Sequence, residues 1–245
     1  MFQRIILPFL LTVSLLAGAS AVFAARAKTG LEVAADGAVP TVVIDAGHGG
    51  EDGGAVSAGG LLEKDVNLDI ALRLRDLLTA NGIPVVMTRT EDTLLYDKNA
   101  NYQGRKKALD LAARRQIAEE TPDCLFVSIH MNAYPDARYD GLQVWYSPNH
   151  PASASVAETI QRTARELLQP ENDREIKAAG SSIYLLHRLT VPAVLVECGF
   201  LSNPAEAAKL STDDYRGQVA FTLFLAISEV CGKTTENFAK SAPNT

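Results

Sequence analysis

Short apolar runs alternate with amphipathic stretches over most of the chain. Runs rich in β-branched residues predict strands, and stretches with an apolar residue every three or four positions predict helices. The predicted strands are residues 41–44, 83–88, 124–129, 142–146, 183–186 and 193–197, and the predicted helices are residues 62–80, 104–119, 152–168 and 213–231, with another helix beginning after Asn203. This order predicts an α/β fold with helices on both faces of one sheet. The alternating pattern of residues 142–146 predicts an edge strand.

The two ends of the chain depart from this pattern. Residues 5–25 carry no charge, follow Arg4 and end in small residues, which is the layout of a secretory signal with cleavage after Ala24. The run is also long enough to span a bilayer, so residues 1–25 are expected to be a signal peptide or an N-terminal membrane anchor. Residues 26–40 are expected to be a linker, residues 41–231 a single domain, and residues 232–245 a disordered tail. We find no internal repeat that would bind a polymer.

Charge and cysteine content narrow the class of protein. The formal net charge is -6, and basic residues do not cluster near aromatic ones, which argues against a nucleic-acid partner. The three cysteines, Cys124, Cys198 and Cys231, lie in or beside apolar segments and lack the spacing of a metal site or a disulfide framework. We interpret them as small buried hydrophobic residues.

Four ionisable residues stand next to predicted strands and helices. His48, His130 and Glu197 follow or end apolar strands, and Glu63 begins the first helix. Because the carboxyl ends of strands in an α/β sheet gather at one edge, we expect these residues to converge on one site. Two imidazoles and one carboxylate form the ligand set of a catalytic zinc ion that keeps one position open. The short motif His-Glu-x-x-His is absent, so the site must be assembled from distant segments.

These residues allow two assignments of roles. In the first, His48, Glu63 and His130 bind zinc, and Glu197 is the general base that takes a proton from water and passes it to the departing amine. In the second, Glu63 and Glu197 exchange roles. The order of the residues along the chain does not decide between the two assignments.

The segment between His48 and Glu63 is rich in glycine. Its glycines are Gly49, Gly50, Gly53, Gly54, Gly59 and Gly60. Such a density suits a loop whose backbone takes positive φ angles or passes close to another group. Glu51 and Asp52 within it are interpreted as solvated loop charges.

Structural explanations also exist for single residues. A histidine at a strand end is more often a hydrogen-bonded structural residue than a ligand, and His150 and His187 fit that explanation. Glu63 alone would favour a helix N-terminus through the helix dipole. Cys198 lies beside Glu197, but no neighbouring histidine would lower the pKa of its thiol, so a nucleophilic role is not expected.

Three segments together resemble a known family. Residues 43–50 with 61–65, residues 126–133, and residues 192–203 are similar to the motif blocks of zinc-dependent N-acetylmuramoyl-L-alanine amidases of type 3, and the resemblance covers residues 41–230. It implies one zinc ion per chain, held by His48, Glu63 and His130, with Glu197 as the catalytic glutamate. The implied reaction is hydrolysis of the amide between muramic acid and L-alanine in peptidoglycan. The implied fold is a mixed, mainly parallel sheet of the phosphorylase/hydrolase-like type. Ala46 departs from the family, in which many relatives have proline.

A narrower likeness points to one branch of this family. A single domain behind an export signal, the basic stretch 105–115, residues 139–146 and Cys198 in the third block are similar to the germination-specific amidases of spore formers. The likeness implies action on spore cortex as a step toward muramic δ-lactam.

The N-terminal segment and the absence of wall-binding repeats carry expectations about location and partners. The protein is expected to be exported and to meet a membrane only through its N-terminal segment. Its localisation or activity is expected to depend on an activating or localising partner protein or on that segment. The alternatives are a vegetative cell-wall amidase, another exported zinc peptidase of peptidoglycan, and a non-catalytic wall-binding protein.

Overall fold

The computed structural model of the protein describes residues 39–96, 99 and 104–232. The expected leader, nearly all of the expected linker and almost the whole expected tail lie outside these residues. Among the described residues, none of the helices is both long and apolar enough to cross a membrane.

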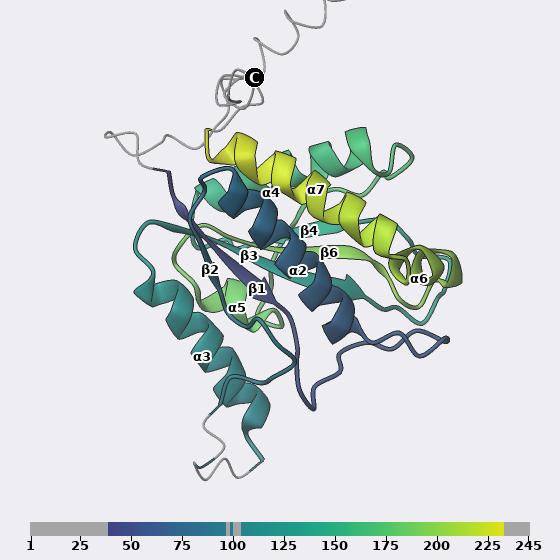
Figure 1. The fold of residues 1–245 in the computed structure, drawn as a ribbon, viewed down its shortest axis with the longest axis horizontal. Helices are drawn as coiled ribbons and strands as arrows, with labels where there is room; N and C mark the ends of the chain where they lie inside the picture. The colour runs from purple at the N-terminus through teal and green to yellow at the C-terminus, as the bar shows by residue number, and fades with distance from the viewer. Residues whose placement is uncertain (1–38, 97–98, 100–103, 233–245) are drawn as a thin grey trace, which may run out of the picture. The chain divides into compact units, whose positions relative to one another are not determined.

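Six strands and six helices make up the described part of the chain (Figure 1). The strands are β1 (Thr41–Ala46), β2 (Val85–Met87), β3 (Cys124–Asn132), β4 (Gln143–Tyr146), β5 (Lys177–Ala178) and β6 (Ala193–Phe200). The helices are α2 (Glu63–Ala80), α3 (Lys106–Glu120), α4 (Ala152–Leu167), α5 (Tyr184–Arg188), α6 (Pro204–Leu210) and α7 (Asp213–Val230).

All six strands belong to one sheet in the order β2-β1-β3-β6-β4-β5. The strands β2, β1, β3 and β6 are parallel, whereas β4 runs antiparallel to β6 and parallel to β5. The sheet is therefore mixed and mainly parallel, and the predicted fold class is confirmed.

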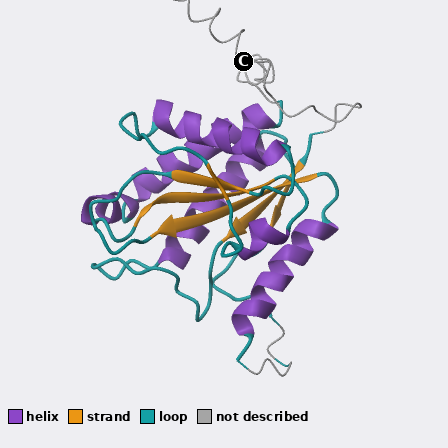
Figure 2. Ribbon diagram, turned by 180° about the vertical axis from the view of Figure 1, so that it is seen from behind, coloured by secondary structure: helices purple, strands orange, loops and turns teal. Residues whose placement is uncertain are grey.

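Helices cover both faces of the sheet because successive strand residues point to opposite sides. On one face, Val42 and Ile44 of β1 join a core formed with α2, α4 and α7. On the other face, Val43 of β1 and Phe126 of β3 pack against α3 and α5. Figure 1 shows α2 and α7 in front of the sheet, and Figure 2 shows α3 and the short α5 on the opposite side.

Local sequence signals fix several helix ends. The side chain of Asn203 accepts hydrogen bonds from the backbone N–H groups of Ala205 and Glu206, so it caps α6 as predicted. Gly82 follows the end of α2 with a φ of 72°, the left-handed conformation that glycine adopts most easily.

Three sequence predictions need correction. Residues 183–186 were predicted as a strand but lie largely in α5, because a short apolar run does not distinguish a strand from a buried helix turn. The strand β4 was predicted at the edge, yet the two-residue β5 pairs outside it. The strands β3 and β6 also continue past their predicted ends, so that His130 and Glu197 lie within strands.

A buried ion-pair network joins α3 to the middle of the sheet. Arg114 of α3 donates to the carboxylates of Asp45 on β1, at 2.7 Å, and Asp110, at 2.8 Å. Ser128 of β3 and Thr88 donate their hydroxyl groups to the same Asp45 carboxylate, at 2.6 and 2.8 Å. Burial opposes ionisation of Asp45, but Arg114 and the Ser128 hydrogen bond outweigh it and hold the pKa of Asp45 below its usual range. The network thus ties β1 and β3 to α3.

We predict that Asp45→Asn lowers the free energy of unfolding by about 3 kcal/mol, because it removes a carboxylate that compensates a buried guanidinium. The measurement is urea denaturation followed by circular dichroism. Arg115→Gln serves as the control on the same helix, since Arg115 pairs with Glu119 at the surface and its loss should cost less than about 1 kcal/mol. Equal losses in the two variants would contradict the role given to the network.

Candidate metal centre

His48, Glu63 and His130 converge from three segments that are far apart in sequence. His48 follows β1, Glu63 begins α2 and His130 lies on β3. One nitrogen or oxygen atom from each side chain lies within 4.8 Å of the others. The structure therefore brings together the three residues predicted as ligands.

Glu63 occupies the centre of this cluster as a buried carboxylate. Its Oε1 lies 3.2 Å from Nε2 of His48 and 2.9 Å from Nδ1 of His130. The backbone N–H groups of Met131 and Ala55 donate to Oε1 and Oε2, at 3.0 and 2.7 Å. Burial opposes ionisation of Glu63, but the contacts with the two imidazoles outweigh it and hold the pKa of Glu63 well below its usual range. The carboxylate is therefore charged and fixed in position.

The backbone around His48 is held by two arginines. His48 has a φ of 60°, which is uncommon for a residue other than glycine. Arg114 donates to the carbonyl oxygens of Ala46 and His48, both at 2.7 Å. Arg89 donates to the carbonyl oxygens of Ala46, at 2.8 Å, and Gly47, at 3.0 Å. These bonds keep the segment in a conformation that the free chain would rarely adopt.

Asp52 lies on the other side of the His48 ring. Its Oδ1 is 3.0 Å from Nδ1 of His48, which leaves Nε2 directed toward Glu63. A carboxylate at one ring nitrogen is a common way to orient a histidine whose other nitrogen binds a metal. The interpretation of Asp52 as a solvated loop charge is therefore wrong. Glu51, in contrast, is exposed and pairs with Lys106, as a surface charge does.

Glu197 lies beside the cluster, and one of its carboxylate oxygens accepts no hydrogen bond from the described residues. It pairs in register with His130, so the two side chains share one face of the sheet. Its Oε2 is buried and has no hydrogen-bond partner among the described residues. Burial raises the pKa of Glu197 to about 7, although nearby His130 acts in the opposite direction.

The donor set fits a metal ion that prefers nitrogen and carboxylate ligands. Two imidazole nitrogens and one carboxylate oxygen face one another, which is the set found in metal sites with an open coordination position. The unpartnered Oε2 of Glu197 beside them suits a group that exchanges protons with a molecule at that position.

Glycines permit the close approach of the ligands. A Cβ atom on Gly47 would lie 2.3 Å from Cε1 and Nε2 of His130, and one on Gly54 would lie 2.5 Å from Oε2 of Glu63. The prediction that this segment passes close to another group is confirmed at Gly54. Gly47, just before His48, allows the same close approach at the end of β1.

Other candidate residues lie outside the cluster. His150 accepts a hydrogen bond from the N–H of Ala152 at the start of α4, and His187 is exposed on α5. All three cysteines are buried, as predicted. Burial and the adjacent Glu197 raise the pKa of the Cys198 thiol, which leaves it without nucleophilic character.

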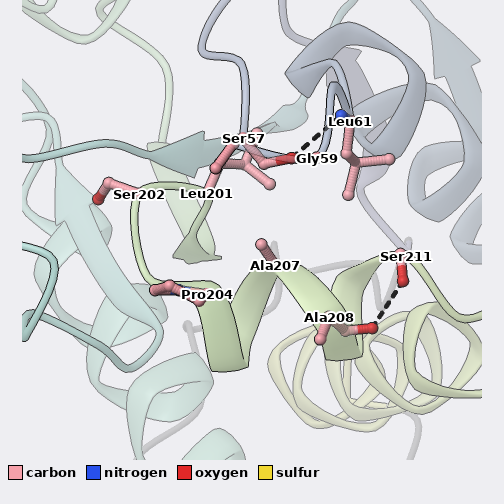
Figure 3. Close-up of a pocket in the computed structure, with 10 residues that line it drawn as sticks. Ser57, Gly59, Leu61, Leu201, Ser202, Pro204, Ala207, Ala208 and Ser211 are labelled. Carbon is pink, nitrogen blue, oxygen red and sulfur yellow. Dashed lines mark hydrogen bonds between the residues drawn. The ribbon is translucent and has the colours of Figure 1, made fainter.

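A pocket of about 340 Å³ lies near the metal centre but does not contain it. Figure 3 shows the loop with Ser57, Gly59 and Leu61 on one side and α6 with Ala207 on the other. None of the three clustered residues lines this pocket, and neither does Glu197. The reacting groups therefore lie outside this pocket.

Sequence reasoning missed the residues that support the site. One face of α3 is buried and carries Asp110, Arg114 and Ala118 at a spacing of four residues. Charged residues on a buried helix face indicate that their charges are paired inside the protein. Arg89 lies in a loop directly after β2 and carried no comparable signal.

The fold and the cluster define an α/β protein with three side chains that could hold a metal ion beside a mainly parallel sheet. Residues 42–229 match the Amidase_3 family, described as N-acetylmuramoyl-L-alanine amidase, and the chain belongs to this family of enzymes. It is 40% identical over 186 residues to the germination-specific N-acetylmuramoyl-L-alanine amidase of Bacillus subtilis, covering 76% of this chain and 77% of that protein. It is 35% identical to the amidase LytC of Bacillus subtilis, covering 74% of this chain but 33% of LytC.

A solved structure agrees with this family. The CwlD amidase from Clostridioides difficile, solved in complex with the GerS lipoprotein, superposes with a TM-score of 0.75 and 36% sequence identity, covering 79% of this chain and 98% of that one. The chain is thus an N-acetylmuramoyl-L-alanine amidase in sequence and in fold.

We predict that Gly47→Ala reduces amidase activity by about 100-fold, because the added methyl group displaces the imidazole of His130. The measurement is the rate of peptide release from purified peptidoglycan. Gly53→Ala is the control in the same loop, since its Cβ would meet only Leu62, at an ordinary 3.6 Å. Near-normal activity of Gly47→Ala would contradict the close packing of His130.

Proposed function

We propose that the protein is a zinc-dependent amidase in which His48, Glu63 and His130 bind one zinc ion and Glu197 transfers protons. One observation carries the proposal: three suitable ligand atoms lie within 4.8 Å of one another beside a carboxylate oxygen that has no partner among the described residues. The reaction is hydrolysis of the amide bond between N-acetylmuramic acid and L-alanine in peptidoglycan.

The different environments of the two glutamates support their separate roles. Glu63 is charged and touches both imidazoles, as a ligand must, whereas the pKa of Glu197 is raised to about 7, near the value at which a carboxyl group both accepts and donates protons. The zinc ion, when bound, polarises the scissile carbonyl and makes water more acidic. Glu197 Oε2 accepts a proton from the attacking water and returns it to the leaving amine.

The supporting residues hold these groups in place. The carboxylate of Asp52, 3.0 Å from Nδ1 of His48, favours a proton on that nitrogen through its charge, so that Nε2 remains available as a ligand. The N–H groups of Met131 and Ala55 keep the Glu63 carboxylate from rotating.

We predict that Glu197→Gln binds zinc like the wild type but loses turnover by at least about 100-fold, because the amide cannot accept a proton. His48→Ala and His130→Ala should lose zinc. Metal analysis of the purified variants, together with a muropeptide digest, measures both effects. Glu51→Gln, at an exposed carboxylate of the neighbouring loop, is the control expected to keep zinc and activity. Near-wild-type cleavage by Glu197→Gln would rule out the proposed role.

Two alternative functions would give different products from the proposed amidase. An exported zinc peptidase that cuts within the stem peptide would leave L-alanine attached to muramic acid, and a non-catalytic wall-binding protein would release nothing. The presence of Glu197 with an unpartnered carboxylate oxygen favours an enzyme, since a binding protein has no need of such a group.

The likeness to a germination-specific amidase supports a role in spore cortex, toward muramic δ-lactam, rather than in the vegetative wall. We propose that the protein is exported, with residues 1–25 as a signal peptide or membrane anchor, residues 26–40 as a linker, residues 41–231 as the catalytic domain and residues 232–245 as a tail. The solved complex of the similar CwlD amidase with a lipoprotein supports a partner protein that activates or localises this chain.

We predict that the domain from residue 41 onward cleaves isolated spore cortex slowly by itself and faster when a lipoprotein partner is added. Mass spectrometry of the released muropeptides should show muramic acid freed of its whole peptide. Vegetative sacculi, treated in parallel, should release less. Full activity of the isolated domain on cortex would remove the need for a partner in catalysis, and equal release from both substrates would contradict the cortex assignment.

A further inference from the structure

The face of the sheet that carries His130 and Glu197 continues beyond the metal centre. In the pairing of β3 with β6, His130 is opposite Glu197 and Asn132 is opposite Phe200. The register shifts by one residue between these two pairs, so Glu197 and Phe200, although three residues apart on β6, each lie opposite a residue on the same face of β3. Figure 2 views this side and shows the strand ends extending past α3 and α5.

Arg174 lies over this continuation. Its guanidinium carbon is 4.6 Å from the centre of the Phe200 ring and 5.7 Å from that of Tyr139. One of its nitrogens donates to the side-chain oxygen of Gln143, at 3.2 Å, and Gln143 is the residue of β4 directly opposite Glu197. Gln143 therefore links Arg174 to the strand position opposite Glu197.

Lys177 lies on the same side, one strand further out. It is exposed on β5 and pairs with Trp145 of β4, and its Nζ is 5.4 Å from the centre of the Trp145 ring. Trp145 is in turn opposite Leu195, two residues before Glu197 on β6. Arg174 and Lys177 thus flank Glu197 on the side away from β1 and His48.

Both cations lack a carboxylate partner within the described part of the chain. Among the residues that the structure describes, no salt bridge joins either cation to Asp173 or Glu175, which are exposed on the same segment. Their aromatic and amide contacts leave the charge uncompensated, although the chain as a whole has a net charge of -6. Unpaired cations beside a reacting centre attract an anionic part of the substrate.

The substrate has two halves of different charge. The sugars of the glycan strand are neutral once the muramic acid carboxyl group is in amide linkage, whereas the stem peptide after L-alanine carries free carboxylates. We propose that Arg174 and Lys177 form a binding edge for a carboxylate of the stem peptide, and that this edge places the leaving peptide on the β4–β5 side of Glu197. The inference rests on the proposed amidase function and adds the orientation of the substrate.

The test compares two substrates that differ in one charge. These are N-acetylmuramoyl-L-alanyl-D-glutamate and its isoglutamine form, in which a carboxamide replaces one carboxylate. The zinc-loaded full chain should cleave the acid with a kcat/KM about tenfold higher, the size of one charge-assisted contact, mainly through KM. The single variants Arg174→Gln and Lys177→Gln should reduce this preference, and the double variant should cleave the acid and the carboxamide with equal kcat/KM. Lys209→Gln is the matched control, because Lys209 also lies over an aromatic ring, that of Tyr215.

A second measurement needs no turnover. In an NMR titration, the wild type should bind L-alanyl-D-glutamate more tightly than L-alanyl-D-isoglutamine, and the double variant should bind the two alike. Equal cleavage and equal binding of the acid and amide forms would overturn the binding edge while leaving the amidase function intact. An equal loss on both substrates in the variants would also overturn it, since that is the effect of a structural role. Selective binding without cleavage of either substrate would support the edge and overturn the proposed function instead.

Discussion

The buried guanidinium of Arg114 is the interaction on which the site depends. It neutralises Asp45 within the sheet and donates to the carbonyl oxygens of Ala46 and His48, so one charged group serves both the core and the loop of the first histidine. A buried charge is tolerated only when its hydrogen bonds are satisfied, and here the loop satisfies them. The unusual backbone of His48 and the stability of the sheet are therefore parts of one network.

Two glutamates of the site, Glu63 on α2 and Glu197 on β6, acquire opposite properties from their surroundings. Glu63 is buried between two imidazoles and two backbone N–H groups, all of which favour its charge. Glu197 is buried without such donors, so its pKa rises to about 7 and its carboxyl group can gain or lose a proton near neutral pH. This contrast is a recurrent way to separate a fixed charge from a proton-transfer group.

The sequence predicts the strand and helix order, the convergence of four residues and the cap at Asn203, because each depends on local periodicity or on the rule that strand ends gather at one edge. It does not predict β5, since two residues carry no period, or the helix at Tyr184–Arg188, since a short apolar run fits either structure. The contacts of Asp52 and Arg89 depend on how distant loops pack, which no local pattern encodes.

The positive φ of His48 has a consequence for the order in which the protein matures. Arg114, which holds this conformation, comes 66 positions beyond His48, and the second imidazole of the cluster, His130, comes 67 positions beyond Glu63. A partly folded chain therefore has no preformed site, and metal uptake must follow assembly of the first three strands with α3. An ion that binds only the folded chain would add its binding free energy to that of folding, so the finished site would also stabilise the fold that forms it.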